Sequence, residues 1–198
     1  MVVLVGKFNP QIFQPSWFAR HNLIPGPEAD AAQLTVVHPE ISDFSLDWCH
    51  LNVSPERLTL DSQRPERYPP LFDLLISTFN LLSHTPITQV GLNKVYEFKF
   101  SNMKEWHAYG HKLAPKEPWA KALTDPGMAA LQMRGSRTDD KKGFITVDIR
   151  TTATQQMRIN VNDHFELGES ETISELLEKN SKRTIEQSDR IVKELLPS

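Results

Sequence analysis

The sequence predicts an α+β fold in which two related halves form one compact globular unit. Short apolar or alternating segments typical of β-strands occur in both halves, and each half ends in a long helical segment. Written as element types, residues 1–84 and residues 85–198 both read strand, helix, strand, strand, strand, helix. We therefore expect a tandem duplication that forms an antiparallel sheet covered by helices on one face.

Two short motifs recur early in each predicted half. Trp17-Phe18-Ala19 corresponds to Trp106-His107-Ala108, and His21-x-Leu23-x-Pro25 corresponds to His111-x-Leu113-x-Pro115. Chance is the alternative explanation, because strands and helices alternate in many α+β domains. Agreement between element order and local residues favours duplication.

The first half begins with Val2–Val5, an apolar β-branched run typical of a buried strand. Pro15 opens a helix that runs to about residue 23, where Pro25-Gly26-Pro27 ends it. Strands are predicted at 34–37, 44–53 and 58–60, with a turn at 54–56 joining the last two into a hairpin. A helix then runs from Pro69 to about residue 83. It is apolar around most of its circumference and should be mostly buried.

The second half begins with the clearest strand, residues 88–100, in which apolar and polar side chains alternate. Lys94 interrupts the apolar face. It is either a buried lysine with a lowered pKa or, as we favour, a residue brought to solvent by a bulge near Gly91. Asn102 begins a helix that ends near residue 113. Strands follow near 128–133, 143–151 and 157–162, and a charged helix from Ser170 to about residue 195 completes the chain.

Composition excludes several functional classes. The chain of 198 residues has 22 basic and 25 acidic side chains, and this near balance makes nucleic acid an unlikely partner. Its one cysteine, Cys49, cannot form an internal disulfide, which favours a reducing, cytoplasmic setting. The N-terminal apolar run is too short for a signal sequence, and no run approaches the roughly 18 to 20 apolar residues of a membrane helix. No cofactor motif is present, so we expect no cofactor.

The candidate binding residues form two groups. Pairing the strands 143–151 and 157–162 with their apolar faces together places five polar residues on the opposite face: Asp148, Arg150, Arg158, Asn160 and Asn162. Their arginines suit a carboxylate, a phosphate or a partner protein, although an ordinary solvated face with ion pairs is equally compatible. The second group is a polar stripe on the apolar helix, made of Asp73, Ser77 and Asn80, which would line a cleft between the halves.

Reactive side chains give weaker signals. His107 and His111 are four residues apart on a helix and are candidate metal ligands, but spacing suggests no third ligand. Cys49 and His50 are neighbours in a strand, so they point to opposite faces and cannot act as a pair; a core cysteine is favoured. The loop from Arg134 to Lys142 has donors that suit phosphate but lacks the context of a P-loop.

Three segments stand out in the middle of the chain: Tyr68-Pro69-Pro70-Leu71, Gly91-Leu92-Asn93 and Phe98-x-Phe100. Together they resemble an uncharacterised group of small bacterial cytosolic proteins with no assigned activity. The resemblance implies a structural role for these motifs and no catalytic role. In outline, the architecture is also similar to duplicated strand-helix-strand-strand domains that bind small molecules or proteins.

Without a catalytic constellation, we expect a non-enzymatic interaction or adaptor module, a subunit of a bacterial protein complex or a homo-oligomer. The last helix is a second candidate contact for a partner. One alternative is a protein that binds a small ligand in a cleft between the halves. Another is a metal-assisted enzyme that uses His107 and His111.

Overall fold

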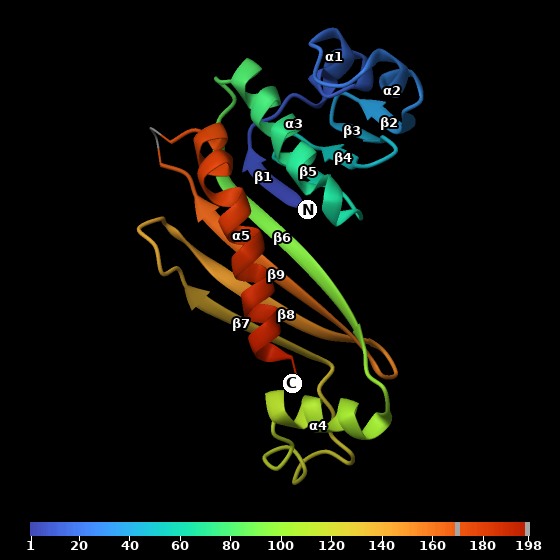
Figure 1. The fold of residues 1–198 in the computed structure, drawn as a ribbon, viewed down its shortest axis with the longest axis vertical. Helices are drawn as coiled ribbons and strands as arrows, with labels where there is room; N and C mark the ends of the chain where they lie inside the picture. The colour runs from blue at the N-terminus through green and yellow to red at the C-terminus, as the bar shows by residue number, and fades with distance from the viewer. Residues whose placement is uncertain (169–170, 197–198) are drawn as a thin grey trace. The chain divides into compact units, whose positions relative to one another are not determined.

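The computed structural model describes residues 1–168 and 171–196 (Figure 1). Within them nine strands form an antiparallel sheet in the order β2-β3-β4-β5-β1-β6-β9-β8-β7, so the chain has the predicted α+β class. The chain divides into two compact units. Unit 1 contains Met1–Leu92 and His164–Thr184, and unit 2 contains Asn93–Asp163 and the residues from Ile185 onward.

Unit 1 holds most elements of the N-terminal half. They are β1 (Val2–Gly6), the short 3₁₀ helix η1 (Pro10–Ile12), α1 (Pro15–Arg20), α2 (Gly26–Asp30), β2 (Gln33–His38), β3 (Ile41–Ser45), β4 (His50–Val53), β5 (Arg57–Asp61), η2 (Pro65–Arg67) and α3 (Tyr68–Leu81). The remaining elements are β6 (Ile87–Lys99), α4 (Met103–Leu113), β7 (Ala130–Ser136), β8 (Gly143–Ala153), β9 (Gln156–Glu166) and α5 (Ile173–Leu195). Strands β6 and β9 and helix α5 each contribute residues to both units.

The predicted strand 44–53 is wrong, because the chain reverses in its middle. The amide of Leu46 donates to the carbonyl oxygen of Cys49 at 2.8 Å, which closes a turn between β3 and β4. Phe44 then lies opposite Leu51 in the β3–β4 pair, and both are buried. The predicted hairpin at 54–56 is confirmed: the amide of Ser54 donates to the carbonyl oxygen of Arg57 at 2.8 Å, between β4 and β5.

The segment Pro25-Gly26-Pro27 also differs from its prediction. The first helix already ends at Arg20, before this segment, and the segment begins a second helix, α2, with Pro25 as its N-cap. A proline in the first helical turn is favourable because its missing N–H would have no partner there. With this helix and the extra strand, the first 84 residues contain one α-helix and one strand more than the expected unit, besides the two short 3₁₀ helices.

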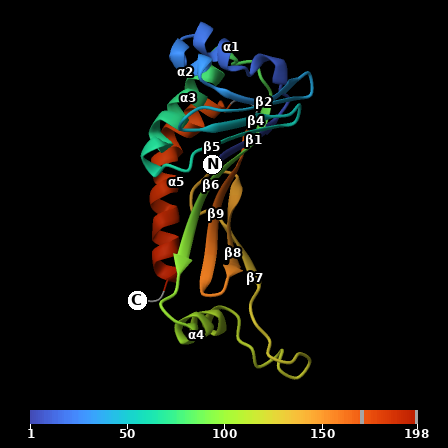
Figure 2. The same cartoon turned by 90° about the vertical axis from the view of Figure 1, so that its right-hand side faces the viewer.

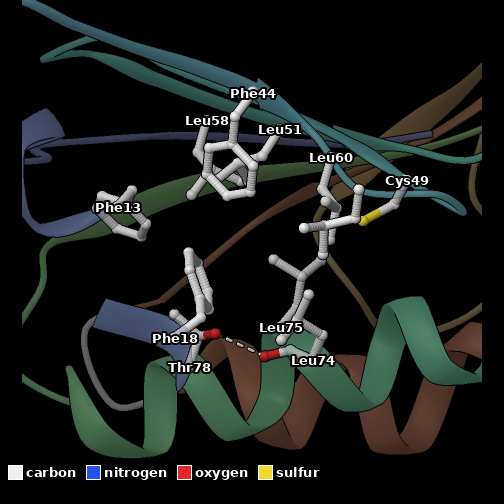
Figure 3. A pocket seen from close by; sticks show the side chains of 11 residues that line it. Phe13, Phe18, Phe44, Cys49, Leu51, Leu58, Leu60, Leu74, Leu75 and Thr78 are labelled. Carbon is white, nitrogen blue, oxygen red and sulfur yellow. Dashed lines mark hydrogen bonds between the residues drawn. The ribbon is translucent and has the colours of Figure 1, made fainter. Parts of the chain in front are cut away.

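Helix α3 packs on the strands of unit 1 through its apolar side (Figure 2). Leu74, Leu75 and Thr78 point toward the side chains of the strands, among them Phe44 and Leu60 (Figure 3). The space left between them is about 10 Å³, which is at the lower limit for one water molecule. This region is therefore a packed core and offers no room for a ligand.

Unit 2 has its own core, in which the strands show the predicted alternation. In β9 every second side chain is buried, from Met157 to Phe165. Ile149, Ile159 and Val161 pack with Phe100, Tyr109 and Val192 of α5. Helix α4 begins as predicted at Asn102, whose side-chain oxygen accepts a hydrogen bond from the amide of Glu105 at 2.9 Å.

Helix α5 contributes its apolar residues near both ends, as predicted. Ile173, Leu176 and Leu177 lie in the core of unit 1, and Val192 lies in the core of unit 2. The predicted start at Ser170 lies outside the described residues. Among the helices within residues 1–168 and 171–196, none combines the length and the apolar character needed to cross a membrane.

Candidate functional site

The five polar residues predicted to share a face of unit 2 do lie on the side of β8 and β9 opposite the core. Asn162 Nδ2 donates to Asn93 Oδ1 at 2.7 Å, and Asn160 Nδ2 lies 3.5 Å from the same oxygen. Arg158 donates through Nε and Nη2 to Glu97 Oε1, at 3.1 and 2.7 Å. Arg150 donates to the two carboxylate oxygens of Asp148 at 2.6 and 3.1 Å.

Both arginines of this face are therefore paired with carboxylates of the same unit. An incoming anion would have to displace Glu97 from Arg158 or Asp148 from Arg150. An exposed ion pair contributes only about 0–1 kcal/mol to stability. An anion could therefore displace either carboxylate, but the new ion pair would add little to its binding affinity. The geometry matches the solvated face with ion pairs that the sequence left open.

Lys94 remains on the apolar side of β6, and the bulge expected near Gly91 is absent from the β1–β6 register, which is regular from Gln89 to Leu92. Its ammonium group lies 2.5 Å from Asp189 Oδ1, and the Tyr96 hydroxyl donates to the same oxygen at 2.7 Å. Burial alone would raise the pKa of Asp189, but these two hydrogen bonds lower it. Asp189 of α5 thus balances the charge of Lys94. The interpretation of Lys94 as a buried catalytic lysine with a lowered pKa is therefore not supported.

The three residues of the polar stripe of α3 differ in exposure. Asp73 and Asn80 are exposed and Ser77 is half-buried. Asn80 Oδ1 accepts a hydrogen bond from Ser174 of α5 at 2.7 Å, within unit 1. This contact gives Asn80 a structural role.

The two candidate metal ligands of α4 have separate surroundings. His107 is exposed and its ring lies 5.1 Å from that of Trp106, whereas His111 Nε2 lies 3.1 Å from Glu117. Within residues 1–168 and 171–196, no three histidine, cysteine or acidic side chains are placed to hold a metal ion. A metal at this helix would need ligands from elsewhere.

Cys49 is buried in the core of unit 1, as expected, and its neighbour His50 faces the other way. Burial raises the pKa of Cys49 to about 12, which keeps the thiol protonated and unreactive. His50 lies between two carboxylates, with Nε2 3.1 Å from Asp43 and Nδ1 3.4 Å from Asp61. The sequence did not suggest this array, because its members come from three adjacent strands.

The array around His50 raises the pKa of His50 and lowers the pKa of Asp43. Burial of the ring opposes protonation, but the hydrogen bonds and charges of Asp43 and Asp61 outweigh it and raise the pKa of His50. Burial would raise the pKa of Asp43, whereas hydrogen bonds from Asn52 and His50 lower it. Since both ring nitrogens are engaged, His50 is poorly placed to act as a general base.

Replacing His50 with glutamine is expected to lower the free energy of unfolding most at mildly acidic pH. The raised pKa of His50 stabilises the fold below the pKa of an unfolded histidine, and this contribution disappears as pH rises through the folded value. The lowered pKa of Asp43 stabilises the fold above the unfolded carboxyl pKa and is lost on acidification. Because His50 is 40% exposed, we expect a loss of about 0.5–1 kcal/mol near pH 5.

Urea denaturation of both proteins at pH 5, 7 and 9 measures this loss. The Asp43→Asn and His50→Gln/Asp43→Asn proteins complete a double-mutant cycle, whose interaction energy should decline from pH 5 to pH 9. An interaction energy that stays constant across this range would contradict the array.

A second buried charge cluster lies in unit 2, at the loop between β7 and β8. Arg137 donates to the two carboxylate oxygens of Asp139 at 2.8 and 2.7 Å, and it also donates to Asp163 of β9. The side chains of Arg137, Asp139 and Asp163 are only 3%, 7% and 4% exposed. Of the two arginines in the segment 134–142 that the sequence suggested for phosphate, Arg137 therefore points inward and Arg134 is exposed.

The two edges of the sheet differ in regularity. Strand β2, at one edge, has a register shift between Leu34 and Val36. Strand β7, at the other edge, pairs with β8 without a shift over seven residues, from Ala130 to Ser136. Natural proteins protect edge strands with bulges, prolines or charged side chains, especially lysine. Strand β7 has no bulge, proline or lysine and only one charged residue, Arg134, so it is the better candidate for an interaction surface.

The ladder also fixes which backbone groups of β7 face outward. The amide of Thr151 donates to the carbonyl oxygen of the residue opposite, Ala129, at 3.0 Å, which identifies a hydrogen-bonded pair. By the alternation of an antiparallel ladder, Leu131, Met133 and Gly135 also bond to β8. The amide and carbonyl groups that point away from β8 belong to Ala130, Gln132, Arg134 and Ser136.

Comparison with known proteins finds no family model that matches the chain and no curated protein that is significantly similar to it. The resemblance of the segments Tyr68–Leu71, Gly91–Asn93 and Phe98–Phe100 to a bacterial group therefore stays a prediction.

Proposed function

We propose that the chain is a non-enzymatic interaction module that assembles by strand pairing at the outer edge of β7. The observation that carries the proposal is the regular seven-residue β7–β8 ladder, whose outer edge is not paired by any strand within residues 1–168 and 171–196. Such an edge presents a row of amide and carbonyl groups ready to bind another strand. Affinity would come from main-chain hydrogen bonds.

The favoured occupant is β7 of a second copy of this chain, in antiparallel orientation. Pairing all seven residues places the two-fold axis at Met133, so Gln132 of one copy faces Arg134 of the other. The backbone amide and carbonyl groups of both residues point away from β8, as a hydrogen-bonded pair between the two copies requires. No like charges face each other in this register.

Met133 supports the same register. Its side chain lies on the apolar side of the sheet, since it is opposite Val147, yet it is 61% exposed. On the two-fold axis the two Met133 residues would form a non-hydrogen-bonded pair, in which side chains approach most closely. Their contact would bury apolar surface that the single chain leaves in water.

Replacing Gln132 with proline is expected to convert a dimer into a monomer. Proline removes the outward amide of residue 132 without removing a bond to β8, because that amide does not belong to the β7–β8 ladder. Size-exclusion chromatography with light scattering, over a dilution series, measures the change. Gln132→Thr keeps the amide and a strand-forming side chain, so it is the matched control and should remain dimeric.

Amide exchange followed residue by residue by NMR tests the geometry itself. In the wild-type protein the amides of Gln132 and Arg134 should be protected, and in Gln132→Pro that of Arg134 should exchange rapidly. The amides of Leu131 and Met133 should stay protected in both, because they bond to β8. A wild-type protein that is monomeric throughout the dilution series, with rapid exchange at Gln132 and Arg134, would overturn the proposal.

We also infer that the two halves of the chain arose by duplication. Support comes from the strand order, which is mirrored about the β1–β6 pair: β1 is followed by β5, β4 and β3, and β6 is followed by β9, β8 and β7. The last helix of each half, α3 or α5, follows the corresponding strand, β5 or β9. Strand β2 and helix α2 would then be additions to the first half.

A further inference from the structure

The segment between α4 and β7 exposes two large apolar side chains close to each other. Trp119 is 58% exposed and Leu123 is 54% exposed. The amide of Leu123 donates to the carbonyl oxygen of Trp119 at 2.9 Å, which closes a helical turn and places both side chains on the same side of it. Exposed apolar side chains that lie together mark an interaction surface, whereas isolated ones are ordinary.

Both side chains line a hollow of about 260 Å³ at the start of β7, within unit 2. Ala129 and Ala130 also line the hollow, and Ala130 is the first residue of β7. Figures 1 and 2 show the segment from α4 at the end of β7 where the strand begins. Met128, another wall of the hollow, packs against the core of unit 2, so the hollow lies on the apolar side of the sheet.

The register of the proposed dimer decides which residues of the second copy reach this hollow. With the two-fold axis at Met133, Ala130 faces Ser136 of the second copy, and Leu131 faces its Gly135. Neighbouring strands lie only about 4.8 Å apart, and Ala130 is itself a wall of the hollow. The paired strand therefore passes directly beside Trp119.

Gly135 leaves an unfilled position at this point of the paired strands. It lies opposite Ile145, on the same apolar side of the sheet as Met133, which lies opposite Val147. Apart from its chain neighbours, no atom of the described residues lies within 4 Å of the place that a Cβ atom would take at Gly135. An aromatic side chain that covers an edge glycine stabilises strand pairing by shielding its backbone. Trp119 of the other copy is the exposed aromatic residue of unit 2 nearest to this position in the register.

We infer that Trp119 and Leu123 of each copy anchor the dimer by covering Gly135 of the other copy. The inference rests on the function proposed above, because it takes its register from the paired β7 strands. The contact removes the exposed indole ring from water, and tryptophan is enriched among the residues that carry most of the binding energy of interfaces. The two-fold axis gives each dimer two such contacts.

Replacing Trp119 with serine should raise the dissociation constant of the dimer at least about thirtyfold, because each dimer loses two anchors. Light scattering over a dilution series measures this change. The variant should fold normally, since the side chain is largely exposed. Leu34→Ser is the matched control: Leu34 is 61% exposed in β2, at the other edge of the sheet, and its loss should leave the dissociation constant unchanged.

Gly135→Val tests the other side of the contact. The backbone of Gly135 does not have a positive φ, and a β-branched residue suits a strand, so the single chain should fold normally. The valine side chain occupies the position that Trp119 covers. It should therefore weaken the dimer at least about tenfold when Trp119 is present, and less than about threefold in Trp119→Ser.

Nuclear Overhauser effects in a mixture of isotope-labelled and unlabelled chains test the contact directly. They should connect the indole protons of Trp119 in one copy with the α protons of Gly135 in the other.

The outcomes separate this inference from the function on which it rests. A monomeric wild-type protein, or a dimer that survives Gln132→Pro, would overturn strand pairing and the anchor with it. A dimer that Gln132→Pro dissociates, but that Trp119→Ser leaves unchanged or tightens, would overturn the anchor alone; tightening would mean that Trp119 shields the edge. Additive effects of Trp119→Ser and Gly135→Val, or no signal between the two residues across copies, would also contradict their contact.

Discussion

Replacing Arg137 with methionine is expected to lower the free energy of unfolding of unit 2 by about 3–5 kcal/mol. The change leaves Asp139 and Asp163 buried without the guanidinium that both now accept from. Two buried carboxylates that lose this guanidinium are costly to keep charged, so at least one of them should become protonated in the variant. The loss of stability should therefore diminish as pH is lowered toward the range in which carboxyl groups titrate.

Hydrogen exchange measured by mass spectrometry locates this effect, because peptides from β7, β8 and β9 should lose protection. Arg134→Met is the matched control, since Arg134 is exposed and only stacks on Phe144 at 4.0 Å from the ring centroid. Its cost should stay below about 1 kcal/mol. A loss for Arg137→Met that equals the control, or that does not depend on pH, would contradict the structural role of the cluster.

Replacing Gly6 with alanine should destabilise unit 1 by about 2–3 kcal/mol. A Cβ atom at this position would lie 2.3 Å from the carbonyl oxygen of Pro86 and 3.1 Å from Cα of Ile87. Both are backbone atoms, so no change of rotamer can relieve the contact. The β1–β6 register shifts between Val5 and Gly6, where the chain passes this close to its neighbour.

Gly26→Ala is the control in the same unit, since nothing lies within 4 Å of a Cβ atom there. Gly26 is the first residue of α2, and alanine there should change stability by no more than about 1 kcal/mol. Urea denaturation of both variants compares the two positions. Equal stability of Gly6→Ala and Gly26→Ala would show that the β1–β6 contact adjusts freely, contrary to the prediction.

Local patterns in the sequence were sufficient to predict the helices and strands that have strong signals. The apolar helix from Pro69, the long strand before residue 100 and the helix that begins at Asn102 all lie where predicted. Each of these elements has a local signal in its own sequence: prolines in the first turn of the apolar helix, alternation over many residues in the strand, and a side-chain cap at Asn102. The strand predicted at 44–53 failed because its turn, Leu46–Cys49, contains no glycine or proline and continues the apolar pattern.

The candidate sites were less predictable, because each joins residues that are distant in the sequence. Alternation correctly placed Arg158, Asn160 and Asn162 on one side of a strand, but their partners Glu97 and Asn93 come from another strand. Nothing local suggested that Arg137 would bury its charge against Asp163, or that Lys94 would pair with Asp189.

The sequence by itself determined the α+β class and the position of most helices and strands, because these depend on local preferences and on the period of apolar residues. The tertiary structure alone decided that β7 is an edge with outward-facing amides and that, among residues 1–168 and 171–196, the buried Tyr109 hydroxyl has no hydrogen-bond partner. Whether a strand lies at an edge, or a polar group is satisfied, depends on which elements become its neighbours. That is a property of the assembled sheet and core, which no single segment of the chain contains.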